Sequence, residues 1–188
     1  MLLMYRKVRH QNISGKYAVR VDAVDGYIEQ WRAERPDLPA GGLVAMAVLG
    51  RLRRLAGLVG PAIGAVLARH GLTTGEFDVL AALRRAGEPF TLTPGELARS
   101  MMLSPAATTH RLDRLEAAGL VGRALDPGNR RSMRVTLTGR GREVVDRAVT
   151  DHVANEERLL AALSPDDVAE LDRLLRALLA GPAARADG

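Results

Sequence analysis

The sequence predicts a mainly α-helical protein that carries one small β-hairpin. Of its 188 residues, 47% are hydrophobic but only 3% are aromatic, so a core must be built mainly from Leu, Val and Ala on helices. Apolar residues recur at helical spacings of three and four along most of the chain. One stretch, SMRVTLT, instead alternates polar and apolar residues directly after a turn-forming sequence, which is typical of a hairpin.

Composition excludes several classes of protein. The chain has no cysteine, which excludes disulfides, thiolate metal sites and a cysteine nucleophile. Its four histidines lack ligand spacing and no glycine-rich phosphate loop follows a strand, so we expect no metal, no cofactor and no enzymatic activity. No apolar run reaches the roughly 18 residues that a membrane span needs. We therefore expect a cytoplasmic protein without a membrane partner.

The N-terminal third is expected to be helical after a flexible extension, residues 1–20. The first helix begins near Val21 and is closed by prolines. Its apolar face is expected to consist of Val21, Val24, Ile28 and Trp31. A longer apolar segment covers residues 43–69, and Pro61 within it predicts a kink or a break.

The next helices have recognisable start and stop signals. Thr74 is expected to cap a helix that ends near Gly87. The buried face of this helix should consist of Phe77, Leu80 and Leu83.

A helix-turn-helix pair is expected to follow. Thr93 and Glu96 form a capping box at the start of its first helix. Ser104, followed by a proline, caps the second helix, which stops at Gly119. Its inward residues are expected to be Leu112 and Leu115.

A two-stranded hairpin is expected next. The turn formers DPGN, residues 126–129, separate LVGRAL from SMRVTLT. On the second strand one side should carry Met133, Val135 and Leu137, and the other Arg134 and Thr136. Thr138 and Ser164 are expected to cap two final helices that are rich in valine and leucine.

Positive charge is concentrated where the hairpin follows the helix. Between Ser104 and Arg134 there are six arginines and three acidic residues, a net +3 of the formal +5. The planar guanidinium of arginine can donate paired hydrogen bonds to phosphates and to base edges. The pI near 10.3 agrees with a nucleic-acid partner. A helix of this kind can enter the major groove while a hairpin arginine enters the minor groove. A solvated basic surface without DNA is the alternative interpretation.

Residues 43–180 resemble the multiple-antibiotic-resistance-regulator (MarR) family of bacterial transcription factors. The most specific part is DPGNRRSMRVTLTGRG, residues 126–141, which resembles the family wing followed by its threonine-capped helix. Asn129 departs from the family pattern, because many members carry an aspartate there. The resemblance implies a homodimer that reads a palindromic operator in double-stranded DNA.

The resemblance also divides the chain into regions. A winged helix-turn-helix DNA-binding domain is expected at residues 71–138. The other regions are a helical dimerisation region at 43–70 and 139–180, an extra N-terminal helix and linker at 21–42, and a flexible tail at 181–188. Terminal helices that pack only within one chain are the alternative.

The expected DNA contacts come from the second helix of the pair and from the wing. On the helix they are Ser104, Thr108, Thr109, His110 and Arg114. On the wing they are Arg130, assigned to the minor groove, and Arg131. In the alternative interpretation, nearby carboxylates neutralise Arg123 and Arg134.

The segment YIEQWRAERPDL resembles the additional N-terminal helix of the urate-responsive subgroup of the family. The resemblance implies a ligand site formed by Trp31, Asp78, Arg111 and Arg123. A purine anion can stack on an indole, accept hydrogen bonds from a guanidinium and donate one to a carboxylate. In the alternative interpretation, Trp31 packs the extra helix down and Asp78 pairs with Arg123.

The sequence therefore predicts a homodimeric, sequence-specific transcriptional repressor whose operator binding is relieved by a small aromatic or anionic ligand such as urate. A ligand that holds Arg111 inward would favour a dimer whose two reading helices no longer match successive major grooves. The alternative function is an architectural DNA-binding protein, or a dimeric interaction protein, without an effector.

Overall fold

The fold is described from a computed structural model of the chain. It covers residues 21–101, 105–126 and 128–181, and of residues 105–107 and 129–131 only the backbone is described. The expected extension 1–20, Ser104 and almost all of the expected tail therefore lie outside the described residues.

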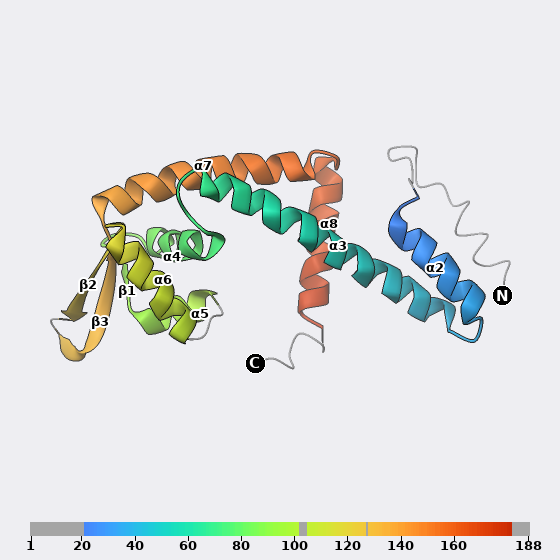
Figure 1. Cartoon of the computed structure of the whole chain (residues 1–188), viewed down its shortest axis with the longest axis horizontal. Coiled ribbons are helices and arrows are strands. Elements are labelled where there is room, and N and C mark those ends of the chain that lie inside the picture. Colours follow the sequence, from blue (N-terminus) through green and yellow to red (C-terminus); the bar gives the residue numbers. More distant parts are fainter. Residues whose placement is uncertain (1–20, 102–104, 127, 182–188) are drawn as a thin grey trace. The chain divides into compact units, whose positions relative to one another are not determined.

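The described chain is mostly helical, with one small antiparallel sheet (Figure 1). In chain order the elements are α2 (Ala23–Glu34), α3 (Ala40–Ala68), α4 (Thr74–Arg85), β1 (Thr91–Leu92), α5 (Pro94–Met101), α6 (Pro105–Ala117), β2 (Val121–Asp126), β3 (Asn129–Leu137), α7 (Gly139–Leu160) and α8 (Pro165–Leu179). The predicted fold class is confirmed. The chain divides into two compact units, residues 1–57 and 58–188, so α3 contributes to both.

In the first unit, ion pairs join α2 to α3. Asp22 caps α2 by accepting hydrogen bonds from the backbone nitrogens of Val24 and Asp25. The Arg51 guanidinium contacts the same two acids, with Nε 2.9 Å from Asp22 and Nη2 2.6 Å from Asp25. The hydrogen bonds from Arg51 lower the pKa of Asp22, and the hydrogen bonds from the Asp22 backbone nitrogen and from Arg51 lower the pKa of Asp25.

The apolar face predicted for α2 is only half correct. Val24 and Ile28 are buried together with Leu43 of α3. Val21 precedes the helix cap and is 84% exposed, and Trp31, in the last turn, is 44% exposed. Trp31 therefore takes no part in the small cluster that holds α2 on α3.

The core of the second unit is built mainly from aliphatic residues of seven elements. Its most deeply buried side chains are Leu67, Val79, Leu80, Leu83, Leu97, Leu112, Leu115, Val135 and Val145. They come from α3, α4, α5, α6, β3 and α7. One core therefore supports both the base of the wing and α6, the second helix of the predicted helix-turn-helix pair, which is called the recognition helix below. The leucine-based core expected from the low aromatic content is confirmed.

One helix cap was predicted one residue too late, and of the kink or break expected at Pro61 the break is absent. The N-cap of α4 is Thr73, not Thr74, because Thr73 forms the capping box with Glu76. Helix α3 continues through Pro61 without a break. A proline removes one backbone donor, and a 29-residue helix keeps its hydrogen bonds on both sides of the missing one.

The sheet has three strands in the order β1-β3-β2, one more than the predicted hairpin. The additional strand is β1, where Thr91 pairs with Thr136 and Leu92 with Val135. On β3, Val135 and Leu137 are buried as predicted, whereas Met133 lies beyond the core and is 37% exposed. The wing is therefore anchored at its base and projects at its tip.

The other start and stop signals are confirmed. Thr93 and Glu96 form their capping box, and Gly119 ends the turn after α6 with a φ of 69° that favours glycine. Thr138 and Ser164 cap α7 and α8. None of the described helices combines the length and the hydrophobicity that a membrane-spanning helix needs.

Candidate nucleic-acid interface and adjoining pocket

Helix α6 packs one face into the core and turns the opposite face outward. Leu112 and Leu115 are 2% and 1% exposed, so the predicted inward positions are confirmed. Thr108 is 1% exposed and belongs to the same inner face. The expectation that Thr108 contacts DNA is corrected accordingly, because one helical turn separates it from Leu112. Thr109 and His110 are exposed on the outer face.

One flank of α6 is attached to the first turn of α4 by two arginines. Arg111 Nη1 donates a hydrogen bond to the carbonyl of Gly75 at 3.4 Å. A Cβ atom at Gly75 would lie 2.4 Å from Arg111 Cζ, so the missing side chain makes room for this guanidinium. Arg114 Nε lies 2.9 Å from Glu76 Oε1 in an ion pair.

The other flank of α6 is attached to the first strand of the wing by Arg123. Its guanidinium pairs with Asp113 at 2.7 Å and with Glu116, whose Oε2 accepts from Nε at 2.8 Å. These hydrogen bonds raise the pKa of Arg123 and lower that of Glu116. The alternative in which Asp78 pairs with Arg123 was therefore wrong, whereas Arg123 does neutralise nearby carboxylates.

The wing carries a cross-strand ion pair near its tip. Arg134 Nε on β3 lies 2.9 Å from Asp126 Oδ2 on β2. Asp126 Oδ1 also accepts a hydrogen bond from the backbone nitrogen of Gly128 at 2.9 Å. Asp126 thus connects the turn of the wing to β3. The side chains of Arg130 and Arg131 lie outside the described residues, although their backbone belongs to β3.

Asp78 lies half-buried on α4, near the Arg111 flank of the recognition helix. Burial raises its pKa, and electrostatic interactions with Arg111, Arg85 and His152 oppose this without cancelling it. A half-buried acid surrounded by basic side chains is a common arrangement in ligand sites. The structure thus brings together Asp78 and Arg111 of the predicted ligand site. Arg123 is held by its own partners on α6, and Trp31 belongs to the first unit.

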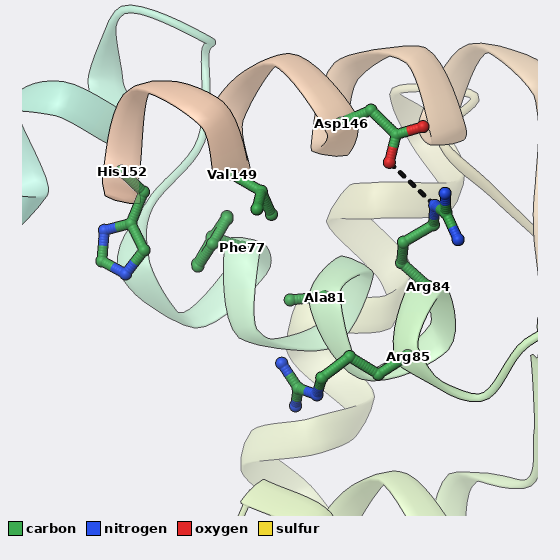
Figure 2. A pocket seen from close by; sticks show the side chains of 7 residues that line it. All are labelled: Phe77, Ala81, Arg84, Arg85, Asp146, Val149 and His152. Carbon is green, nitrogen blue, oxygen red and sulfur yellow. Dashed lines mark hydrogen bonds and ion pairs between the residues drawn. The ribbon is translucent and has the colours of Figure 1, made fainter. Parts of the chain in front are cut away.

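A half-open pocket of about 370 Å³ lies between α4 and α7 in the second unit (Figure 2). Its lining residues are Phe77, Ala81, Arg84, Arg85, Asp146, Val149 and His152. The rings of Phe77 and His152 meet edge to face, with centroids 5.0 Å apart. At the other end of the pocket, Arg84 Nε donates a hydrogen bond to Asp146 Oδ1 at 2.7 Å. The side chain of Arg85 extends below Ala81 in the view of Figure 2.

The pocket combines an apolar aromatic floor with cationic side chains. Phe77, Ala81 and Val149 supply surface for a flat ring, and Arg85 supplies charge for an anion. Among the described residues, no group of three or more His, Asp or Glu side chains could hold a metal ion. Sequence reasoning did not find this pocket, because its residues are spread over two helices that only folding brings together.

The comparisons with known proteins agree with this arrangement. The model of the MarR family matches residues 70–132, which include α4, the helix-turn-helix pair and most of the wing. The transcriptional regulator PecS of Dickeya dadantii is 38% identical over 152 residues, which are 81% of this chain and 90% of PecS. The chain therefore belongs to the MarR family, and it is a DNA-binding transcriptional regulator rather than an enzyme.

Solved structures of the family share the fold. AbsC of Streptomyces coelicolor has a TM-score of 0.66 at 27% identity, covering 75% of this chain and 93% of AbsC. A mutant of Escherichia coli MarR in complex with operator DNA has a TM-score of 0.63 at 26% identity, covering 79% and 97%. Mycobacterium tuberculosis Rv2887 with p-aminosalicylic acid has a TM-score of 0.54 at 33% identity, covering 75% and 98%.

Proposed function

We propose that this regulator is a homodimeric repressor that binds a palindromic operator and is released from it by a small aromatic anion. The observation that carries the effector part is the pocket on α4, because two of its lining residues, Arg85 and His152, interact electrostatically with Asp78, and the first turn of the same helix contacts Arg111 of the recognition helix. DNA binding follows from the family, and the palindrome follows from the symmetry of a dimer.

The proposed DNA surface combines α6 with the wing. Thr109 and His110 are exposed on the outer face of α6, where they can reach base edges. Arg114 lies at the edge of this face and is 55% exposed. Ser104, Arg130 and Arg131 remain part of the proposal, with Arg130 assigned to the minor groove. The complex of the E. coli MarR mutant with operator DNA supports this general mode.

The proposed dimer uses helices that leave apolar side chains uncovered. Helix α8 is described along its whole length and none of its residues is buried, although its sequence is strongly amphipathic. The exposed leucines on this helix are Leu174, Leu175, Leu178 and Leu179. Apolar surface of this extent marks a protein interface, and a second copy of the chain supplies a matching one.

The proposed effector is a planar aromatic compound with a negative charge, such as urate or an aromatic carboxylate. A ring of this kind fits between Phe77 and Val149, and its anionic group is attracted to Arg85. The complex of Rv2887 with p-aminosalicylic acid supports the aromatic carboxylate class. Urate would additionally engage Trp31 and Arg123, and Arg123 would then have to leave its partners on α6.

The proposed effector acts through differential affinity for two arrangements of the recognition helix. An anion near Asp78 and Arg85 changes the electrostatic balance that Arg111 experiences. If Arg111 moves toward the anion, α6 changes its attachment to the first turn of α4. DNA and effector then oppose each other, because each favours a different arrangement.

Gel-shift titrations with urate and p-aminosalicylate test the effector proposal. The duplex is one selected from a random pool by the wild-type chain. We expect both Asp78→Asn and Arg85→Gln to need about tenfold more ligand for release while operator affinity changes little. Arg173→Gln, on the exposed surface of α8, is the control and should respond like wild type. Equal ligand sensitivity in all four proteins would refute the proposal that the effector binds in this pocket.

A further inference from the structure

Two capping boxes in the second unit have almost the same geometry. At the start of α4, Glu76 Oε2 accepts from the nitrogen and hydroxyl of Thr73 at 2.8 and 2.7 Å. At the start of α5, Glu96 Oε2 accepts from the nitrogen and hydroxyl of Thr93 at 2.7 and 2.8 Å. The two glutamates therefore perform the same local task for their helices.

The two glutamates differ in what surrounds them. Glu96 is exposed, whereas Glu76 is buried with 6% exposure. The second carboxylate oxygen of Glu76, Oε1, lies 2.9 Å from Arg114 Nε on the recognition helix. Glu76 thus also forms an ion pair with α6, whereas Glu96 interacts electrostatically with Arg99 of its own helix and with Arg134 of the wing.

Glu76 is ionised at neutral pH despite its burial. Burial favours the neutral acid, but the hydrogen bonds from Thr73 and the charge of Arg114 outweigh it, so its pKa is lowered. A buried carboxylate needs a cation nearby, because an isolated buried charge is costly. This requirement fixes the position of the Arg114 guanidinium.

The ion pair engages the inner part of the guanidinium. Nε is the nitrogen nearest the backbone, and the two Nη groups lie beyond it on a side chain that is 55% exposed. Arg114 is one helical turn from His110, which is on the outer face of α6. The two Nη groups of Arg114 therefore lie at the border of the proposed DNA surface. The ion pair between Nε and Glu76 sets the orientation of the guanidinium.

We infer that Glu76 is a positioning residue for DNA binding: by holding Nε of Arg114, it presents the Nη fork of this arginine to a DNA backbone phosphate. The fork matches two phosphate oxygens and gives a charge-assisted contact. Long side chains lose rotamer freedom on binding, and a side chain held in advance loses less. The inference rests on DNA binding through α6, and it does not require an effector.

The comparison of Glu76→Gln with Glu96→Gln provides the test. Each substitution removes one negative charge from a capping box, and glutamine still accepts hydrogen bonds from the threonine. Electrostatics alone predicts equal or tighter DNA binding for both, because each raises the net charge by one. We expect Glu96→Gln to bind the selected duplex as tightly as wild type or more tightly. Glu76→Gln should bind this duplex about 2- to 10-fold more weakly than Glu96→Gln.

The phosphate contact itself is tested by salt dependence. Arg114→Gln should reduce the slope of log K against log salt by about 0.9 for each subunit that loses a phosphate contact. Glu76→Gln introduced into Arg114→Gln should cause no further weakening, because no arginine is left to position. Thermal unfolding of each variant identifies any protein that has lost its fold. If the Arg114→Gln proteins fail to fold, Arg114→Lys replaces them.

Lysine keeps the charge and can pair with Glu76, but its single nitrogen cannot also bind a phosphate in the same way. We therefore expect folded Arg114→Lys to bind DNA more weakly than wild type. Equal binding by Glu76→Gln and Glu96→Gln, an unchanged salt slope in Arg114→Gln, or wild-type affinity in Arg114→Lys would overturn the inference. Absence of any operator preference in the wild-type chain would instead refute the proposed repressor.

Discussion

At the scale of single residues, Asp78 illustrates a conflict between stability and function. Its carboxyl group is half-buried, and burial raises its pKa above the ordinary value of 3.8. A folded-state pKa above the unfolded one means that the ionised carboxylate disfavours folding at neutral pH. Protonation removes this cost as the pH falls through the folded pKa. Acidic groups whose burial destabilises the folded protein are found more often at functional sites, and this is consistent with the proposed effector site.

The predicted consequence is that Asp78→Asn stabilises the protein at neutral pH. Asparagine has no charge to bury, so the gain should be complete at pH 7 and should shrink as the pH falls toward 3.8. Urea denaturation at about pH 7 and about pH 4 measures this gain in stability as the difference between the urea midpoints of the variant and wild type. A variant that is less stable than wild type at pH 7 would contradict this account of Asp78.

At the scale of elements, the first turn of α7 fixes this helix against the end of α6 and the wing. Thr138 Oγ1 accepts a hydrogen bond from the nitrogen of Gly141 at 2.9 Å and donates toward the carbonyl of Gly119 at 2.9 Å. A Cβ atom built on Gly141 would lie 2.0 Å from the backbone oxygen of Leu120. Because backbone cannot move aside as a flexible side chain can, glycine is required here.

Gly141→Ala is therefore expected to destabilise the protein by about 1–3 kcal/mol, the usual cost of overpacking. Gly139→Ala, in the same helical turn, has nothing within 4 Å of the added Cβ and serves as the matched control. It should be neutral or should stabilise the protein by up to about 1 kcal/mol, because alanine favours a helix over glycine. Urea denaturation compares the two variants. Equal stability would show that α7 can shift away from Leu120.

At the scale of the whole molecule, the described residues leave many large apolar side chains exposed. Helix α8 carries four exposed leucines, and Leu159 and Leu160 at the end of α7 are each 40% exposed. The family relationship makes a second copy of the chain the natural partner for this surface.

Leu178→Asp is expected to convert the proposed dimer into single chains of 20.2 kDa and to weaken operator binding strongly. A buried aspartate without a partner is costly in an apolar interface. Ala169→Asp adds the same charge on the opposite side of α8, since nine residues at about 100° each amount to half a turn beyond two full ones, and should remain dimeric. Light scattering after size-exclusion chromatography measures the mass. An unchanged mass for Leu178→Asp would exclude α8 from the interface.

The local signals in the sequence were sufficient for most of the elements. Helix caps involve only residues that are close in sequence, so they can be predicted without knowledge of the fold. Examples are the capping box of Thr93 and Glu96, Gly119 and Thr138. The alternation on β3 likewise predicted which residues face the core, because a strand turns alternate side chains to opposite sides. The order of these elements then predicted the winged helix-turn-helix.

Only the tertiary structure decided which charges meet. Arg123 pairs with Asp113 and Glu116 rather than with Asp78, and Arg114 pairs with Glu76, which no spacing in the sequence indicated. The addition of β1 to the hairpin was also beyond sequence reasoning. Such contacts depend on how distant segments pack, and an arginine side chain is long enough to reach several carboxylates. The sequence determined the helices, the wing and the family, whereas packing selected the partners that hold the recognition helix in place.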